Sequence, residues 1–511
     1  MRKTWNQIQS FLVSRYMWWG IILLGIFLRS YLYFLNRSLW ADEASLAINL
    51  VTRDFSELAQ LLDYHQAAPV GFLFVEKFFI TIFGNHDYVF RIFPLISGVL
   101  VIYFIYRFAR THLGPAGLFA LAIASITWWF VYHSSEAKQY SSDIMVASLL
   151  IFLAGNCFKE EAKSKEFFLL GIVGSVVIWI SHPSVFILAG IGITLAFEKI
   201  TQKEYVPWAW ILSIGLGWLF SFGIEYLVSL RHIVADGYLI EYWRKAYVPS
   251  PPWSNKAWYG RTFLYFLDYT YHKPDQIMTW ATLILIPIGA LSALIRNRKI
   301  AFLLISPFVI VYMASALHLY PLKDRFLLFL IPFIILLTAE GFRGIYWVFS
   351  KWNRDFAIVL TGMLAFFIVW QIVPITYERV FSGRTVNIRP VIEYVAEKKH
   401  PDDIVYVFYR SNSVVSYYAP LYGIDEENII IGIDGPFKQD AHQGFRDDVD
   451  VLAGEERVWF IFSEVADCPN CEDEDTQSYY LSFINKYGTL IDSVGGAASN
   501  GANAYLYDMT P

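Results

Sequence analysis

Long apolar stretches, separated by short polar and basic segments, fill the chain from Tyr16 to about Val373. An apolar run of about 18 or more residues is long enough, as a helix, to cross a hydrocarbon core about 30 Å thick. The pattern therefore predicts a mostly α-helical bundle with about 11 to 13 membrane spans. The expected spans are 16–35, 92–109, 113–132, 141–158, 167–181, 183–199, 208–229, 277–295, 300–318, 326–346 and 356–374.

One further apolar stretch, Pro69–Phe83, is shorter than these spans and carries Glu76 and Lys77 at its centre. Charge at the centre of an apolar segment is costly in lipid. We therefore expect this stretch to form a helix that lies in the membrane interface or re-enters from one side.

Lys and Arg gather on one side of the expected spans. Cytoplasmic loops collect these residues, and Arg2, Lys3 and Arg15 therefore place the N-terminus in the cytoplasm. If Pro69–Phe83 is interfacial, five later basic clusters fall on the same side: Arg107/Arg110, Lys159/Lys163/Lys165, Lys199/Lys203, Arg296/Arg298/Lys299 and Lys351/Arg354. The segments 39–90 and 230–276 and the chain after about 374 are then extracytoplasmic.

The last part of the chain alternates short apolar runs with polar, helix-like stretches, a pattern that predicts a small α/β domain. We divide the chain into a membrane domain, 1–375, and an extracytoplasmic α/β domain, 376–511. Strands are expected at 404–408, 428–433, 457–462 and 503–508, and helices at 390–399, 412–420, 441–452 and 474–486. The turn Cys468-Pro-Asn-Cys471 leaves three readings open: a structural disulfide, which an extracytoplasmic location favours, a redox pair or half of a metal site.

Composition agrees with a membrane protein, since 56% of the residues are hydrophobic and 17% are charged, against about 25% charged in soluble domains. The formal net charge of −5 gives no reason to expect a nucleic-acid partner. Three cysteines exclude a disulfide framework. The first apolar run ends at Asn36-Arg37-Ser38 without a small-residue cleavage motif, so we interpret it as a retained helix and not as a secretory signal.

Two adjacent carboxylates, Asp42 and Glu43, follow Trp40 in the first extracytoplasmic loop. Ionisable groups at a membrane edge are costly unless they are used, which makes the pair a candidate catalytic site. The structural alternative is that Asp42 caps a helix over Ala44–Leu50 while Glu43 interacts with the helix dipole.

Further polar side chains are expected on the same face. The loop 134–143 holds four of them between two spans: Glu136, Lys138, Tyr140 and Asp143. They would form a site, or Glu136 and Lys138 would be solvated interface charges. Cationic or potentially cationic candidates come from two other loops: His65, Arg91, His318, Lys323 and Arg325. Arg325 would either snorkel to the interface or bind a phosphate in bidentate fashion.

Carboxylates and cations on one membrane face suit sugar transfer from a polyprenyl phosphate. A carboxylate would deprotonate an acceptor hydroxyl, which attacks the anomeric carbon from the face opposite the leaving group. The leaving phosphate needs positive charge and not a general acid. Lys138, Lys323 and Arg325 would supply that charge.

At these residues the sequence resembles the integral-membrane GT-C glycosyltransferases, in particular protein O-mannosyltransferases and the transferases that add aminoarabinose to lipid A. The resemblance covers about residues 15–375. The family's acidic pair is matched by Trp40-Ala41-Asp42-Glu43-Ala44, and its Ser-x-Glu-Ala-Arg-x-Tyr loop by Ser134-Ser135-Glu136-Ala137-Lys138-Gln139-Tyr140, where lysine replaces arginine. The family's His-x-Pro-Pro element is matched, with a wider histidine-to-proline spacing, by His65-Gln66-Ala67-Ala68-Pro69. The elements that follow it in the family are matched by Phe83-Gly84, Arg91 and Lys323-Asp324-Arg325-Phe326.

The resemblance implies that Asp42 is the catalytic base and that Glu43, Glu136 and Asp143 are supporting carboxylates. It implies that the donor phosphate is bound by Lys138, Tyr140, Lys323, Arg325 and Arg91, and that the acceptor or the sugar meets His65, His318 and Trp253. Some relatives use a divalent metal ion, so a metal stays open here. The implied partners are a lipid-linked sugar donor, membrane lipid and an acceptor that is a glycan, a lipid or a protein.

Other functions remain as alternatives: another lipid-linked transfer, transport, or a non-catalytic assembly scaffold. A secondary transporter would show paired repeat halves, but the long loops 37–90 and 230–276 differ in composition. The loop 230–276 is rich in aromatic residues, Trp253 among them, which would form an interface belt or stack against a sugar. The compact loops favour a bacterial plasma membrane as the location.

Overall fold

The computed structural model describes residues 14–159, 162–201, 207–272, 276–382, 387–432, 441–463, 465, 476–495 and 501–510. The chain folds into two compact units. The first unit consists of Met1–Leu35 and Asp54–Gly383, and the second of Asn36–Arg53 and Arg384–Pro511. The segment after the first span is therefore part of the C-terminal unit, whereas the sequence-based division placed it in the membrane domain.

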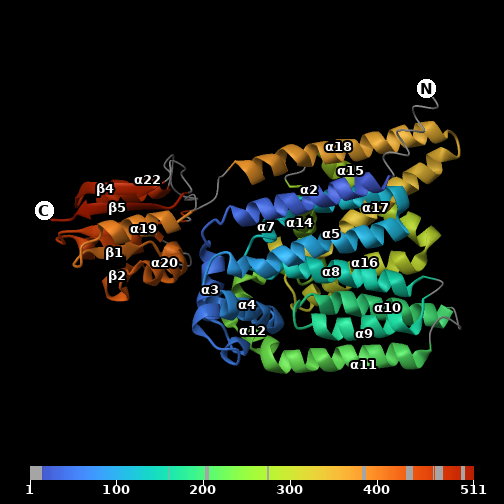
Figure 1. The fold of residues 1–511 in the computed structure, drawn as a ribbon, viewed down its shortest axis with the longest axis horizontal. Helices are drawn as coiled ribbons and strands as arrows, with labels where there is room; N and C mark the ends of the chain where they lie inside the picture. The colour runs from blue at the N-terminus through green and yellow to red at the C-terminus, as the bar shows by residue number, and fades with distance from the viewer. Residues whose placement is uncertain are drawn as a thin grey trace. The chain divides into compact units, whose positions relative to one another are not determined.

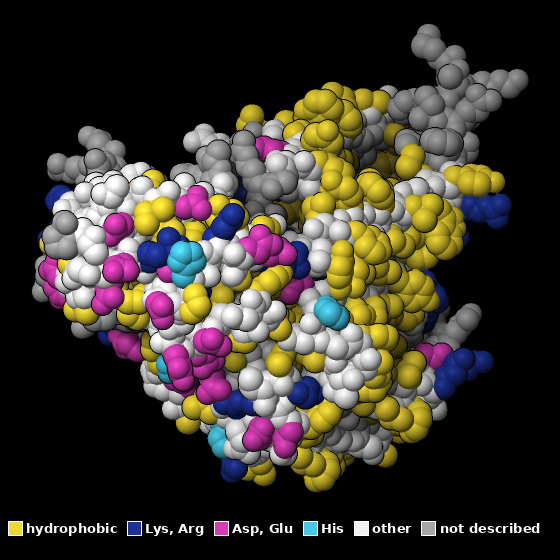
Figure 2. Space-filling view, turned by 60° about the vertical axis from the view of Figure 1, so that its left-hand side comes forward, with side chains coloured by type: hydrophobic (Ala, Val, Ile, Leu, Met, Phe, Trp, Pro, Cys, Tyr) yellow, Lys and Arg dark blue, Asp and Glu magenta, His cyan; other side chains and the backbone are white. Residues whose placement is uncertain are grey.

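The first unit is a bundle of long apolar helices (Figure 1). Among the described residues, nine helical segments are long and apolar enough to cross a membrane, and the chain is an integral membrane protein. Hydrophobic side chains gather on a broad surface of the bundle (Figure 2). The segments are α2 (Arg15–Phe34), Val89–His112 with α5 (Ile92–His112), α8 (Tyr140–Cys157), α10 (Ser184–Thr201), Trp208–Val234 with α11 (Trp208–Glu225) and α12 (Arg231–Val234), α15 (Gln276–Arg296), α16 (Arg298–Ala316), Asp324–Ser350 with η8 (Asp324–Leu330) and α17 (Ile331–Ser350), and α18 (Arg354–Phe381).

Two of the expected spans are shorter than predicted. The expected span 113–132 is divided into α6 (Gly117–Ile126) and α7 (Trp128–His133), and the expected span 167–181 corresponds to α9 (Ser164–Val177). The break after α6 frees backbone carbonyl groups, which must find new donors inside a membrane protein. Arg29 of α2 supplies such donors: its Nη1 donates to Ser125 O at 3.0 Å and its Nη2 donates to Ala124 O at 2.9 Å. This buried arginine thereby fixes the point at which α7 begins.

The stretch expected at the interface forms α4 (Val70–Phe83), which lies at one end of the bundle in Figure 1. The N–H of Gly71 donates to Trp179 O at 2.7 Å. A Cβ at this position would stand 2.5 Å from the same oxygen, so the close approach requires glycine. Glu76 is buried, and this burial raises the pKa of its carboxyl well above the usual value.

Short elements complete this unit between the long helices. They are η1 (Glu57–Ala59), η2 (Asp63–His65), η3 (Val89–Arg91), η4 (Gly114–Ala116), η5 (Tyr226–Leu230), α13 (Gly237–Tyr242), η6 (Arg244–Ala246), η7 (Pro252–Ser254) and α14 (Lys256–Tyr271).

The described residues of the second unit form a five-stranded sheet of order β2-β1-β3-β5-β4. Strand β1 pairs in parallel with β2 and β3, whereas β5 is antiparallel to β3 and β4. The four expected strands are confirmed, but β4 was missed because most of its side chains are exposed at the sheet edge. The elements are β1 (Ile404–Val407), β2 (Ile429–Ile431), β3 (Val458–Phe462), β4 (Thr489–Gly495), β5 (Asn503–Asp508), α19 (Arg389–Lys398), η9 (Tyr409–Ser411), α20 (Asn412–Tyr418), η10 (Ala419–Tyr422), η11 (Glu426–Asn428), α21 (Ala441–Leu452) and α22 (Thr476–Ile484). Cys468 and Cys471 lie outside the described residues.

Helix α3 (Ala41–Thr52) packs against α20 within this second unit. The hydroxyl of Tyr418 accepts a hydrogen bond from Leu39 N at 2.8 Å. Ser413 Oγ donates to Ala41 O at 2.9 Å. These two bonds hold the start of α3, where Asp42 and Glu43 stand.

Candidate active site

The first group of candidate side chains lies in the loop Ser134–Gln139, which joins α7 to α8. Glu136 is 1% exposed and Lys138 is 4% exposed. The interpretation of this loop as solvated interface charge is therefore wrong. Burying a carboxylate and an ammonium is costly unless both are hydrogen-bonded or paired, and each of them has such a contact.

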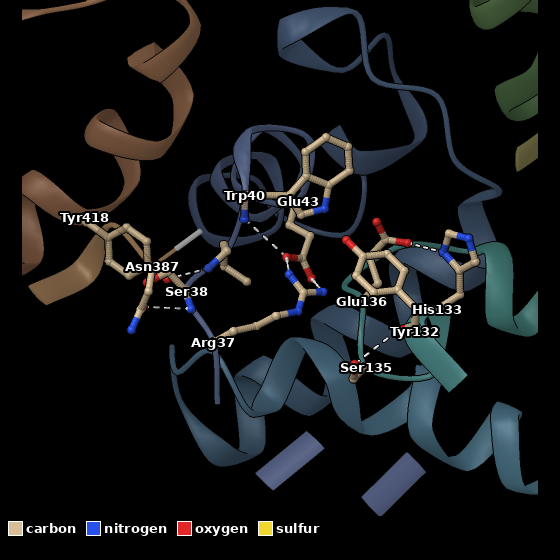
Figure 3. Close-up of polar contacts among 11 residues, drawn as sticks. Arg37, Ser38, Trp40, Glu43, Tyr132, His133, Ser135, Glu136, Asn387 and Tyr418 are labelled. Atoms are coloured by element: carbon tan, nitrogen blue, oxygen red, sulfur yellow. Dashed lines mark hydrogen bonds and ion pairs between the residues drawn. The ribbon is translucent and has the colours of Figure 1, made fainter. Parts of the chain in front are cut away.

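Glu136 is held by His133, the last residue of α7. The Nδ1–H group of His133 donates to Glu136 Oε2, and both side chains are buried (Figure 3). The ring of Trp129 stacks on His133 with 5.7 Å between ring centroids. His133 was not among the candidates from the sequence, although its position three residues before Glu136, at the end of a helix, is a spacing that brings two side chains together.

Lys138 connects the loop to the segment that precedes α4. Its Nζ donates to Gln66 Oε1. Next to it, Gln139 Nε2 donates to Ala67 O at 3.0 Å. These bonds bring Lys138 close to the chain at His65, although the two residues are far apart in the sequence.

A third contact joins this loop region to η8. The guanidinium carbon of Arg325 lies 5.2 Å from the ring centroid of Tyr140, which is a cation–π contact. Burial raises the pKa of Tyr269, the charges of Asp324 and Glu136 raise it further, and Arg325 opposes them. The charges of Glu136 and Arg325 thus act on the same side chain, Tyr269. Lys323 Nζ lies 3.7 Å from Asp324 Oδ2.

His65 stands beside this region as one half of a histidine–carboxylate pair. Its Nδ1 lies 2.9 Å from Asp236 Oδ2, and its ring stacks on Tyr238 at 4.1 Å. Burial alone would raise the pKa of Asp236, but the hydrogen bonds from His65 and from the first N–H groups of α13 hold it below its usual value. Tyr64 and His65 both have positive φ, 58° and 50°, a strained conformation that costs about 1–3 kcal/mol per residue.

The remaining candidates of this unit are more dispersed. Asp143 is 9% exposed in the first turn of α8 and lies beside Ser181. Arg91 is buried at the end of η3. His318 is exposed and its ring is 5.2 Å from Tyr247. Trp253 is 76% exposed, so the structure does not bring it into the buried group.

In the second unit, the two adjacent carboxylates have different surroundings, and Figure 3 shows those of Glu43. Glu43 is fully buried and accepts from Arg37 Nη1 at 2.8 Å and Nη2 at 3.3 Å, and from Trp40 N at 3.2 Å. Asp42 is partly exposed. Because α3 begins at Ala41, Asp42 lies inside the first turn and is not the cap that the structural alternative required. Arg37 was not among the sequence candidates.

The described residues contain no group of three or more His, Cys, Asp or Glu side chains that would hold a metal ion. The divalent metal that the resemblance left open thus has no cluster of this kind in the described parts of the chain.

Comparison with known proteins connects this arrangement to one enzyme class. Residues 67–222, which include the Ser134–Gln139 loop, match the sequence model of the dolichyl-phosphate-mannose-protein mannosyltransferase family. The fold is similar to that of ArnT from Cupriavidus metallidurans bound to undecaprenyl phosphate, with a TM-score of 0.54 and 12% identity over 95% of this chain and 98% of that chain. Over residues 67–222 the chain resembles a family of membrane glycosyltransferases, and over most of its length it has a fold similar to that of ArnT. The predicted resemblance and the predicted helical fold are thereby confirmed.

A second similar structure is the oligosaccharyltransferase of Archaeoglobus fulgidus in its apo form. Its TM-score is 0.53 at 11% identity, over 94% of this chain and 73% of that chain. At such identities the structural similarity establishes the fold alone. No curated protein sequence matches the chain.

Proposed function

We propose that the chain is a glycosyltransferase that moves a sugar from a polyprenyl-phosphate donor to an acceptor hydroxyl on the extracytoplasmic face, with inversion at the anomeric carbon. The observation that carries the proposal is the buried loop with Glu136 and Lys138, which lies inside the region matched by the mannosyltransferase family. ArnT, which has the same fold, was solved with undecaprenyl phosphate bound. A buried ammonium next to a buried carboxylate fits an anionic lipid headgroup better than it fits a transported neutral solute.

The donor phosphate meets Lys138 and Arg325 in this proposal. Lys138 is positioned by Gln66, and Arg325 by the face of Tyr140. Cations at the departing phosphate stabilise the negative charge that develops as the bond to the sugar breaks. Lys323 and Arg91 contribute positive charge from flanking positions, and His65, His318 and Trp253 are the proposed contacts of the acceptor or the sugar.

Asp42 is the proposed general base. Its carboxylate takes the proton of the acceptor hydroxyl, whose oxygen forms the new bond to the anomeric carbon. The bond between that carbon and the phosphate oxygen breaks, and its electron pair leaves with the polyprenyl phosphate. Glu43 is fully engaged by Arg37 and Trp40, so it is a positioning residue in this proposal, as is Glu136 with His133.

The acceptor is a glycan, a lipid or a protein, and the extracytoplasmic orientation rests on the basic clusters in the loops. Purified protein in lipid nanodiscs, incubated with undecaprenyl phosphates that carry different single sugars, tests the proposal. We expect one of these sugars to be released from its lipid, with free undecaprenyl phosphate as the second product. Release of no sugar from any lipid, by protein that is folded and binds lipid, would refute it.

A further inference from the structure

Side chains from the far end of the sequence hold the segment on which the proposed base, Asp42, stands. The N–H of Leu39 donates to the hydroxyl of Tyr418 at 2.8 Å, and the two residues are 379 positions apart. Ser413 Oγ donates to Ala41 O at 2.9 Å, across 372 positions. Tyr418 and Ser413 both belong to α20, so one helix of the second unit binds the backbone directly before Asp42.

The same segment is bound a second time, at its beginning. The N–H of Ser38 donates to Asn387 Oδ1 at 3.2 Å. Arg389, the first residue of α19, donates through its N–H to Ser38 Oγ at 3.0 Å and through Nη2 to Asn36 O at 2.7 Å. Asn36 has a φ of 45°, a left-handed conformation that asparagine adopts more readily than most residues. The chain from Asn36 to Ala41 is therefore attached to the start of α19 and to α20.

The contacts with α20 lie in the interior of the second unit. Leu39 and Tyr418 are each 1% exposed, and Ser413 is 6% exposed. A buried N–H group is costly to leave unpaired, so the backbone at Leu39 is expected to shift when the Tyr418 hydroxyl is removed. Ala41 O also accepts from Ser45 Oγ at 2.8 Å, so the loss of the Ser413 hydroxyl should disturb the segment less.

The bonds from α20 differ in their effect from those around Glu43. Glu43 accepts from Arg37 and from Trp40 N, which lie in the same short segment, so these bonds shape the first turn of α3. The bonds from α20 fix where that turn stands within the second unit. A general base acts only within hydrogen-bond reach of the proton that it takes, and a misplacement of about 1 Å lowers the rate by about 100-fold.

We propose that Tyr418 and Ser413 are positioning residues for sugar transfer, because they hold the backbone that carries Asp42. The inference rests on the proposed function, since it requires Asp42 to be the base. It divides the work between the two units: the proposed phosphate contacts, Lys138 and Arg325, belong to the first unit, whereas the base and its supports belong to the second. Removal of the Tyr418 hydroxyl should therefore slow transfer without weakening the binding of the donor.

The test compares turnover and donor binding in the full-length protein in nanodiscs. Turnover is the release of undecaprenyl phosphate from undecaprenyl phosphates that carry mannose, glucose, galactose or arabinose, and the affinity for bare undecaprenyl phosphate is measured in parallel. We expect kcat to fall by about 10- to 100-fold in Y418F and by a smaller factor in S413A. The KM for the lipid-linked sugar and the affinity for bare undecaprenyl phosphate should stay at the wild-type values.

Two control variants remove hydroxyl groups of the same kinds from the same unit. Tyr507 is 2% exposed, and its hydroxyl donates to Asn485 Oδ1 at 2.8 Å. Ser416 lies in α20, and its Oγ donates to Asn412 Oδ1 at 3.0 Å. Neither bond involves the segment before Asp42, so Y507F and S416A should keep the wild-type kcat even where they lower the melting temperature. All assays are run below the lowest melting temperature of the set.

Unchanged kcat in both Y418F and S413A overturns the positioning role, as does an equal loss of kcat in the control variants or a matching loss of affinity for undecaprenyl phosphate. If Y418F does not fold, S413A alone decides between these results. The variant D42N separates this inference from the proposed function. If D42N is inactive while Y418F and S413A turn over normally, only the positioning role falls. If the wild type releases no sugar, or D42N turns over at the wild-type rate, the proposed function itself fails.

Discussion

The guanidinium group of Arg37 forms two hydrogen bonds with the carboxylate of Glu43, at 2.8 and 3.3 Å. Both side chains are nearly or fully buried, at 9% and 0% exposure. Asp42, the preceding residue, is partly exposed. Two carboxylates that are adjacent in the sequence thus have different surroundings: Glu43 is hydrogen-bonded to Arg37 and to the backbone at the start of α3, whereas Asp42, the proposed base, is partly exposed.

Replacing Glu43 with Gln should therefore destabilise the second unit. The change replaces the carboxylate that accepts two hydrogen bonds from the buried Arg37 guanidinium with a neutral amide, and breaking a buried ion pair in this way costs about 3–5 kcal/mol. Thermal unfolding of the full chain should show a lower melting temperature for E43Q than for the wild type. The double variant R37M/E43Q removes both charges and should recover much of the loss. Equal melting of E43Q and the wild type would contradict the positioning role.

Replacing Lys138 with Met should weaken binding of the donor. The change removes one charge-assisted contact to the phosphate, which corresponds to about a 10- to 100-fold loss of affinity. Binding of undecaprenyl phosphate to protein in nanodiscs measures it directly. Lys351 is a matched control, because it is an exposed lysine stacked on Trp347 at 3.5 Å. K351M should bind like the wild type, and equal losses in both variants would show a nonspecific charge effect.

Asp403 makes the stability of the second unit depend on pH in the acidic range. Burial alone would raise the pKa of this carboxyl, but Arg457, the N–H of His400 and the indole N–H of Trp459 hold it below its usual value. Because the pKa of Asp403 is lower in the folded state than in the unfolded state, its carboxylate stabilises the fold at pH values above the unfolded-state pKa of about 3.9. This stabilisation is lost as the pH falls through the folded-state pKa.

Hydrogen exchange of peptides that cover β1 and β3, corrected for intrinsic rates, follows this loss in the full chain. Protection should stay constant from about pH 7 to 5 and decrease below about pH 4. In D403N protection should be lower at neutral pH and should change less in acid. An acid dependence that is identical in D403N would assign it to other groups.

The orientation predicts which loops are open to reagents outside the cell. Ser254 lies exposed in η7 of the predicted outer loop, and Asn353 lies exposed before α18 on the predicted cytoplasmic side. S254C should react with a membrane-impermeant maleimide in intact cells, and N353C only after the membrane is broken. The wild type supplies the background, and the reverse labelling pattern would invert the topology.

The elements of this fold could be predicted because their signals are local. Apolar runs gave the long helices, and short alternating runs gave four of the five strands. The residue types of the site were also visible, since charged side chains at membrane edges are costly unless they are used. The break after α6 was not visible, because it depends on Arg29, which reaches the freed carbonyl groups from another helix.

The partners of the site residues could not be predicted, because they come from distant parts of the chain. His65 and Asp236 are 171 positions apart, and Leu39 and Tyr418 are 379 positions apart. Hydrophobic patterns carry no information about such pairs. The same reason explains why Asn36–Arg53 was assigned to the membrane domain and not to the C-terminal unit.

The most direct test of the account compares sugar transfer by the wild type and by D42N with the lipid-linked sugar that the wild type consumes. The change keeps the shape of the side chain and removes its basicity, so we expect turnover to fall by about 100- to 10,000-fold while the melting temperature and the affinity for undecaprenyl phosphate stay the same. Turnover of folded D42N at the wild-type rate would contradict the assignment of Asp42 as the base.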